Sequence, residues 1–171
     1  MRILVAGVGN VLKGDDGFGV RAIQMIMSEG DLPDGVTTIE TGIGGIHLVQ
    51  ELSVGYDALI LIDAMDRRGV PGELFLVEPV LPDLTTMTDR ERRDFFADMH
   101  YATPVRALTL AREINALPPI VRIIGCQPHD AETFGATLSP AVTSAVQRAA
   151  SMVVEQCRSL SDSDPHFPTA M

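Results

Sequence analysis

Residues 58–63 read Ala-Leu-Ile-Leu-Ile-Asp, which is five apolar residues in a row followed by an acid. An apolar run without polar alternation offers no side to water, so a strand formed by it must be covered on both faces. Central strands of parallel sheets have this pattern because helices pack on both sides of them. The run therefore predicts a central parallel strand, with Asp63 at its carboxyl end.

Further elements alternate on either side of this strand. Short apolar runs predict strands at residues 2–7, 36–41, 73–77 and 120–126. Helical spacing predicts helices at residues 17–29 and 46–52, and Thr103-Pro104 and Ser139-Pro140 each begin a further helix, the first ending near residue 115. Residues 78–99 are irregular, and we expect them to form a surface excursion with one helical turn or more.

This order of elements predicts a three-layer α/β fold, with a mostly parallel, twisted five-stranded sheet and helices on both faces. The strand at 73–77 follows a connection that is too short for a helical crossover, so we expect it to be antiparallel. A chain of 171 residues can bury a sizeable core. We predict one domain over residues 1–160 and a flexible C-terminal tail over residues 161–171.

The composition excludes several classes of function. The net charge is −10, from 23 acidic and 13 basic residues, which disfavours binding to nucleic acid or to anionic lipid. Two cysteines are too few for a disulfide framework. The chain begins directly with a strand-like run and contains no apolar run long enough to span a membrane, so we expect a cytoplasmic protein.

Acidic residues follow four of the predicted strands. Asp15 and Asp16 lie in the loop after the first strand, Glu40 ends the second, Asp63 ends the third, and Asp130 follows the strand at 120–126. In open α/β sheets, ligands bind outside the carboxyl ends of the strands. We therefore expect the functional site at this edge of the sheet.

The loop after the first strand has an alternative interpretation as a dinucleotide site. Gly7 and Gly9 have the required spacing, but Leu12 occupies the position of the third glycine. Asp15 and Asp16 lie where the helix should receive a phosphate, and their charges would repel it. A non-catalytic metal-binding or nucleotide-binding α/β module remains the alternative function.

Three residues form the candidate site, although each also has a structural explanation. Asp16 could cap a helix, Asp63 could cap a loop, and a histidine such as His100 is often only structural. Carboxylate oxygens and an imidazole nitrogen can together hold a divalent ion such as nickel or zinc. Asp16, Asp63 and His100 are candidate ligands if the fold brings them together.

The segment 126–130, Cys-Gln-Pro-His-Asp, suggests a rival mechanism with Cys126 as the nucleophile. Triad residues are normally brought together by the fold rather than by adjacency in the sequence, and Cys126 also suits a buried strand end. We assign no role to His47, His129 or His166.

The first nineteen residues resemble the hydrogenase maturation proteases, endopeptidases that trim the large subunits of [NiFe]-hydrogenases. The similarity lies in residues 3–12, Ile-Leu-Val-Ala-Gly-Val-Gly-Asn-Val-Leu, and in residues 15–19, Asp-Asp-Gly-Phe-Gly. Weaker similarities follow at residues 40–45, 59–64, 100 and 138–142, so that the resemblance covers about residues 1–157.

The resemblance implies a twisted five-stranded α/β sheet and a single cut near the C-terminus of the large-subunit precursor, after nickel insertion. It implies that Asp16, Asp63 and His100 are the metal-binding and catalytic residues, with aspartate at position 16 where the family often has glutamate. The implied metal is nickel carried by the substrate, for which zinc or cadmium could substitute. Alternatively, the protease holds its own ion, which activates a water molecule. The implied partner is the precursor, without nucleic acid or membrane insertion, and the protein is expected to be a monomer or weak oligomer.

Overall fold

The structure is a computed structural model that describes residues 1–29, 31–43, 45–97, 103–135 and 137–162. The strands are β1 (Ile3–Val8), β2 (Val36–Gly42), β3 (Ala58–Ala64), β4 (Leu74–Val77) and β5 (Ile120–Cys126). The helices are α1 (Phe18–Glu29), α2 (Gly45–Leu52), α3 (Asp89–Phe96), α4 (Pro104–Glu113) and α5 (Pro140–Asp162).

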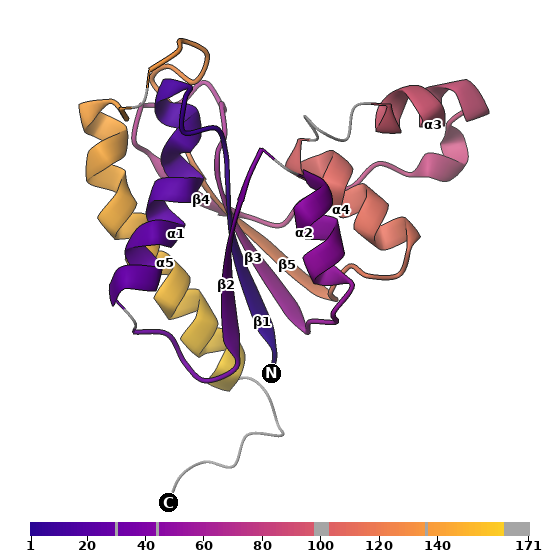
Figure 1. The fold of residues 1–171 in the computed structure, drawn as a ribbon, viewed down its shortest axis with the longest axis horizontal. Coiled ribbons are helices and arrows are strands. Elements are labelled where there is room, and N and C mark those ends of the chain that lie inside the picture. The colour runs from indigo at the N-terminus through magenta and orange to yellow at the C-terminus, as the bar shows by residue number, and fades with distance from the viewer. Residues whose placement is uncertain (30, 44, 98–102, 136, 163–171) are drawn as a thin grey trace, which may run out of the picture.

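The five strands form one sheet in the order β2-β1-β3-β5-β4 (Figure 1). The pairs β1–β2, β1–β3 and β3–β5 are parallel, and β4 pairs antiparallel with β5. The predicted mostly parallel sheet with one antiparallel strand is therefore confirmed. Because the four parallel strands run in the same direction, their carboxyl ends meet at one edge of the sheet.

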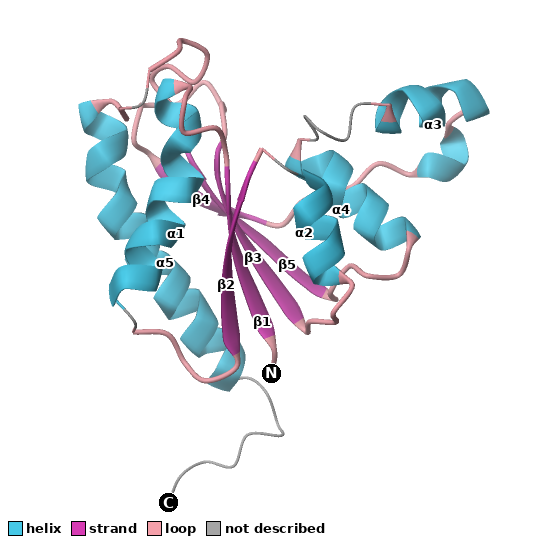
Figure 2. Cartoon of the chain, in the orientation of Figure 1, coloured by secondary structure: helices cyan, strands magenta, loops and turns pink. Residues whose placement is uncertain are grey.

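Side chains alternate between the two faces of the sheet and divide the core into two parts. Ile60 and Ile62 of β3 pack with α1 and α5, whereas Leu59 and Leu61 pack with α2 and α4. This alternation explains why the run at 58–62 must be apolar throughout, since each face is covered by a pair of helices (Figure 2). The predicted three-layer arrangement is confirmed.

Helix α1 packs very close to the sheet, and this contact depends on glycine. A Cβ atom at Gly19 would lie 2.1 Å from the carbonyl oxygen of Ile62 and 2.3 Å from that of Val8. Both carbonyl groups belong to strands of the sheet, so they cannot move aside as a flexible side chain could. The missing side chain at Gly19 therefore lets the start of α1 lie directly against the ends of β1 and β3.

The region expected to be irregular contains the helix α3, which extends from Asp89 to Phe96. Its first turn is closed by a capping box, in which Thr88 accepts a hydrogen bond from the Glu91 backbone and Glu91 accepts one from the Thr88 backbone. None of the residues of α3 is buried, and the helix stands away from the sheet (Figure 2). Local capping therefore stabilises a helix that the core does not support.

The last helix, α5, continues to Asp162, so it includes two residues that we expected in the tail. The rest of the predicted tail, residues 163–171, lies outside the described part of the chain. Within residues 1–162, apart from the undescribed gaps, none of the helices is both long enough and apolar enough to cross a bilayer.

Candidate functional site

A pocket of about 420 Å³ opens at the carboxyl ends of β1 and β3. Its lining residues come from β1, β3, the start of α4 and three loops: Val8, Gly9, Asn10, Lys13, Asp16, Ile43, Asp63, Ala64, Thr103, Pro104 and Glu132. The fold thus brings Asp16 and Asp63 to one cavity, at the edge of the sheet where the sequence placed the site. His100, the third candidate, lies outside the described residues, although Thr103 follows it closely in the chain.

The loop before α1 fixes the position of the Asp16 carboxylate. The backbone N–H of Asn10 donates to Asp16 Oδ2 at 2.9 Å, and Asn10 Oδ1 accepts from the Leu12 N–H at 3.0 Å. Gly9 has a φ of +133°, and a Cβ atom there would lie 1.8 Å from the Asp16 carbonyl oxygen. Glycine at position 9 therefore permits the tight loop that turns Asp16 toward the pocket.

Asp63 is part of β3, and its side chain faces the α2 and α4 side because Leu59 and Leu61 face that side. The residue is only 9% exposed. Burial, together with the nearby Asp16 carboxylate, raises the pKa of Asp63 to about 8. Burial also raises the pKa of Asp16, against the opposing effects of the Asn10 N–H and the Lys13 ammonium. The pocket therefore holds two carboxyl groups whose ionised forms are disfavoured by burial, and the Asp16 carboxylate further disfavours ionisation of Asp63.

Lys13 and Glu132 form an ion pair on the wall of this pocket, with 3.4 Å between Lys13 Nζ and Glu132 Oε2. Neither residue was predicted from the sequence as part of the site. They lie 119 positions apart, and no local pattern marks Glu132 as a neighbour of the first loop. Only the pairing of two loops across the end of the sheet brings them together.

Asp15 has a structural role that differs from the capping of its own helix. Its carboxylate accepts hydrogen bonds from the backbone N–H groups of His129 at 2.8 Å, Asp130 at 3.1 Å and Ser139 at 2.6 Å, and from the Ser139 hydroxyl at 2.9 Å. Burial alone would raise the pKa of Asp15, but these hydrogen bonds outweigh it and lower the pKa. Asp15 therefore joins the first loop to the start of α5.

The remaining candidates lie away from the pocket. Glu40 is exposed on β2, where it accepts a hydrogen bond from Gln24 Nε2 at 2.9 Å. Cys126 belongs to the core beneath α1 and α5, on the face of the sheet opposite Asp63. Burial, with a contribution from Asp15, raises the pKa of the Cys126 thiol to about 11, which disfavours a thiolate nucleophile. His129 contributes its backbone N–H to Asp15.

Among the described residues, no three histidine, cysteine or acidic side chains are grouped as metal ligands. Asp16 and Asp63 supply carboxylate oxygens, which are suitable ligands for a divalent ion, and the third candidate ligand falls in the undescribed segment 98–102. The described part of the pocket therefore offers an incomplete set of ligands.

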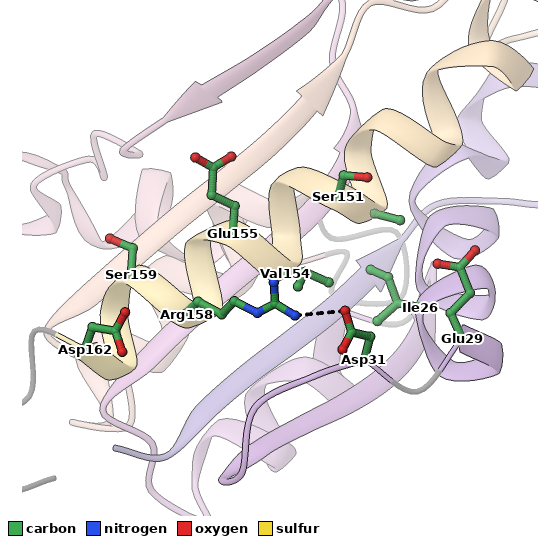
Figure 3. A pocket seen from close by; sticks show the side chains of 10 residues that line it. Ile26, Glu29, Asp31, Ser151, Val154, Glu155, Arg158, Ser159 and Asp162 are labelled. Carbon is green, nitrogen blue, oxygen red and sulfur yellow. Dashed lines mark hydrogen bonds and ion pairs between the residues drawn. The ribbon is translucent and has the colours of Figure 1, made fainter. Parts of the chain in front are cut away.

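A second cavity, of about 500 Å³, lies between α1 and α5 (Figure 3). Ile26 and Val154 contribute apolar surface there, and Arg158 pairs with Asp31 at 2.8 Å. This cavity lies beside the C-terminal ends of α1 and α5, away from the carboxyl ends of the strands where α/β sheets bind their ligands. Cavity size alone therefore does not identify the site.

Comparison with known proteins identifies the family. A family model described as hydrogenase maturation protease matches residues 20–156. The hydrogenase expression/formation protein HupD of Rhizobium leguminosarum is 34% identical over 158 residues, which cover 92% of this chain and 75% of that protein.

Solved structures agree with this relationship. The hydrogenase maturating endopeptidase HybD from E. coli is 26% identical, with a TM-score of 0.73 and 94% of each chain covered. A hydrogenase 2 maturation peptidase from a Thaumarchaeota archaeon is 32% identical, with a TM-score of 0.64, and the match covers 91% of this chain and 97% of that one. The chain therefore belongs to the hydrogenase maturation protease family, whose members are hydrolases.

Proposed function

We propose that this protein removes a short C-terminal peptide from the nickel-loaded precursor of a [NiFe]-hydrogenase large subunit. Membership of the family supports a protease role in hydrogenase maturation. The observation that carries the proposal is the single pocket lined by both Asp16 and Asp63 at the carboxyl ends of β1 and β3. A cytoplasmic location and a monomeric or weakly oligomeric state remain predictions.

In this proposal Asp16, Asp63 and His100 recognise the nickel that the precursor carries. A divalent ion between the two carboxyl groups would offset both the burial and the repulsion by Asp16 that raise the pKa of Asp63. Zinc or cadmium could substitute, since carboxylate and imidazole groups also bind these ions. By binding a group fixed in the precursor, the three side chains would orient the adjoining peptide bond for cleavage.

The pocket supports the version in which the substrate, rather than the protease, brings the metal. Asp16 and Asp63 line a pocket that opens at the edge of the sheet, so an ion fixed in a precursor could reach both carboxyl groups. A precursor that holds nickel through its own ligands would also present the adjoining peptide bond together with the ion.

The test is incubation of the protein with nickel-loaded precursor, followed by mass spectrometry of the precursor. We expect a loss of mass that corresponds to one C-terminal peptide, and no loss with metal-free precursor. Asp16→Asn, Asp63→Asn and His100→Ala should each stop cleavage, because each removes one proposed ligand of the nickel.

Glu40→Gln is the matched control, since Glu40 also lies near a strand end but outside the pocket, and this variant should cleave normally. Binding of the precursor without any change in its mass would contradict the proposed cleavage and favour a non-catalytic module. Normal cleavage by the Asp16, Asp63 and His100 variants would show that the site has been misassigned.

A further inference from the structure

Two loops beside the pocket are held together as one unit, which we call the loop pair (residues 10–14 and 129–135). Lys13 and Gly135 form a parallel bridge. The Gly14 N–H donates to the Gly135 carbonyl at 2.7 Å, and the Gly135 N–H donates to the Leu12 carbonyl at 2.9 Å. These backbone hydrogen bonds add to those that the Asp15 carboxylate accepts, so the two loops are held together in a fixed backbone conformation.

The loop pair nevertheless exposes two large apolar side chains. Phe134 is 79% exposed and Leu12 is 59% exposed. They precede the bridged residues Gly135 and Lys13, so they are neighbours across the bridge. Single exposed hydrophobic residues are common, but two adjacent ones on a hydrogen-bonded backbone resemble the preorganised anchors of protein interfaces.

The position of the loop pair links this surface to the proposed active site. Lys13 and Glu132, which belong to the loop pair, line the pocket that contains Asp16 and Asp63. Ile43, another exposed apolar residue, also lines that pocket. A protein that inserts a segment into the pocket would therefore be brought against Leu12 and Phe134.

The size of the pocket indicates that recognition must extend beyond it. A cavity of about 420 Å³ admits only a short stretch of peptide. A specific protein–protein complex buries about 800 Å² on each partner, so a folded precursor must also contact the surface around the rim. The loop pair contributes Lys13 and Glu132 to the pocket wall and carries the exposed Leu12 and Phe134 on a hydrogen-bonded backbone.

We infer that Leu12 and Phe134 dock the folded body of the hydrogenase large-subunit precursor, while the pocket receives its C-terminal segment. This inference rests on the proposed function, because it names the surface that the proposed substrate uses. Phe134 and Leu12 are then affinity determinants, and they take no part in peptide cleavage.

The experiment compares Phe134→Ala and Leu12→Ala with the wild-type protein for binding and for cleavage of nickel-loaded precursor. We expect the Kd for the precursor to rise about tenfold for Phe134→Ala and about threefold for Leu12→Ala. The kcat at saturating precursor should stay within twofold. Phe134→Leu should restore most of the affinity, because it restores apolar area.

Two exposed valines outside the loop pair and the pocket lining serve as matched controls. Val54 is 58% exposed, like Leu12, and Val80 is 93% exposed. Val54→Ala and Val80→Ala should leave the Kd unchanged. Thermal unfolding of every variant separates a loss of docking from a loss of folding, and the high exposure of Phe134 predicts an unchanged melting temperature.

Direct measurement of Kd keeps this test independent of the proposed cleavage. If Phe134→Ala and Leu12→Ala bind the precursor with the same Kd as the wild-type protein, the docking inference is overturned, whether or not the precursor is cut. Failure of the wild-type protein to cut a precursor that it binds through Phe134 would instead contradict the proposed function alone. Sedimentation that shows a dimer dissociated by Phe134→Ala would assign the surface to a second copy of the chain and also overturn the inference.

Discussion

Asp15 and Asp63 are both buried at the carboxyl end of the sheet, yet their surroundings shift their pKa values in opposite directions. The Asp15 carboxylate accepts four hydrogen bonds that hold its charge in place. Asp63 instead lies beside a second carboxyl group in an open pocket. The first acid serves the fold, whereas the second is held in an unfavourable state that a ligand can relieve.

The largest effect on stability is expected for Asp15→Ala. The substitution removes the acceptor from the partly buried backbone N–H groups of His129, Asp130 and Ser139, and each such loss costs up to about 1–3 kcal/mol where water cannot replace the acceptor. Because these costs overlap and water can satisfy part of the group, we expect a total loss of about 3–5 kcal/mol in the free energy of unfolding. Urea unfolding at pH 7 measures this loss.

Two comparisons make the Asp15 prediction specific. Asp16→Asn changes the adjacent acid, which accepts a single backbone hydrogen bond, and should cost much less. The lowered pKa of Asp15 stabilises the fold above its unfolded value of 3.8, and this stabilisation is lost as the pH falls through the lower folded value. The difference in the free energy of unfolding between the wild type and Asp15→Ala should therefore become smaller at acid pH. A difference that does not depend on pH would argue against the carboxylate as its source.

Asp63→Asn is expected to change the free energy of unfolding in the opposite direction, by stabilising the fold at higher pH. The unfolded chain ionises Asp63 near pH 3.8, whereas the folded chain retains the proton to about pH 8, so the folded state loses relative stability throughout this interval. Asparagine removes this loss, whereas the cost of burying its amide is the same at both pH values. We therefore expect the stability of Asp63→Asn relative to the wild type to be higher at pH 8 than at pH 4 by a few kcal/mol.

Thermal unfolding at the two pH values measures this difference directly. Glu40→Gln, which removes an exposed carboxylate outside the pocket, is the control for the change of charge. If Asp63→Asn were destabilising at pH 8, Asp63 would be a structural acid like Asp15, and the contrast between the two sites would fail.

The arrangement of the sheet could be predicted from the sequence because it depends on local patterns. The five apolar residues before Asp63 occupy β3, whose alternating side chains enter the two halves of the core. The short connection before β4 correctly indicated an antiparallel strand. Helix α3 also had a local signal, the Thr88-x-x-Glu91 capping box, which our interpretation of residues 78–99 did not use.

The site could be predicted only in part, because its remaining components come from distant segments. The hydrogen bonds of Asp15 to Asp130 and Ser139 span 115 and 124 positions, and no periodicity in the first loop indicates those partners. Strand ends, by contrast, have a predictable location in a parallel sheet, so Asp63 and the loop that carries Asp16 could be placed at one edge. The difference in charge and burial between the surroundings of Asp15 and Asp63 arises only in the folded structure, so it could not be predicted from the sequence.

The smallest effect is expected for Cys126→Ala, which tests whether the neighbourhood of Asp15 takes part in cleavage. Cys126 lies on the opposite face of the sheet from Asp63, and both burial and Asp15 raise its pKa. We therefore expect the cleavage rate to stay within twofold, with a loss of about 1 kcal/mol in stability from the small cavity. A folded but inactive Cys126→Ala variant would place a nucleophile on the α1 and α5 face and remove the functional distinction between the two acids.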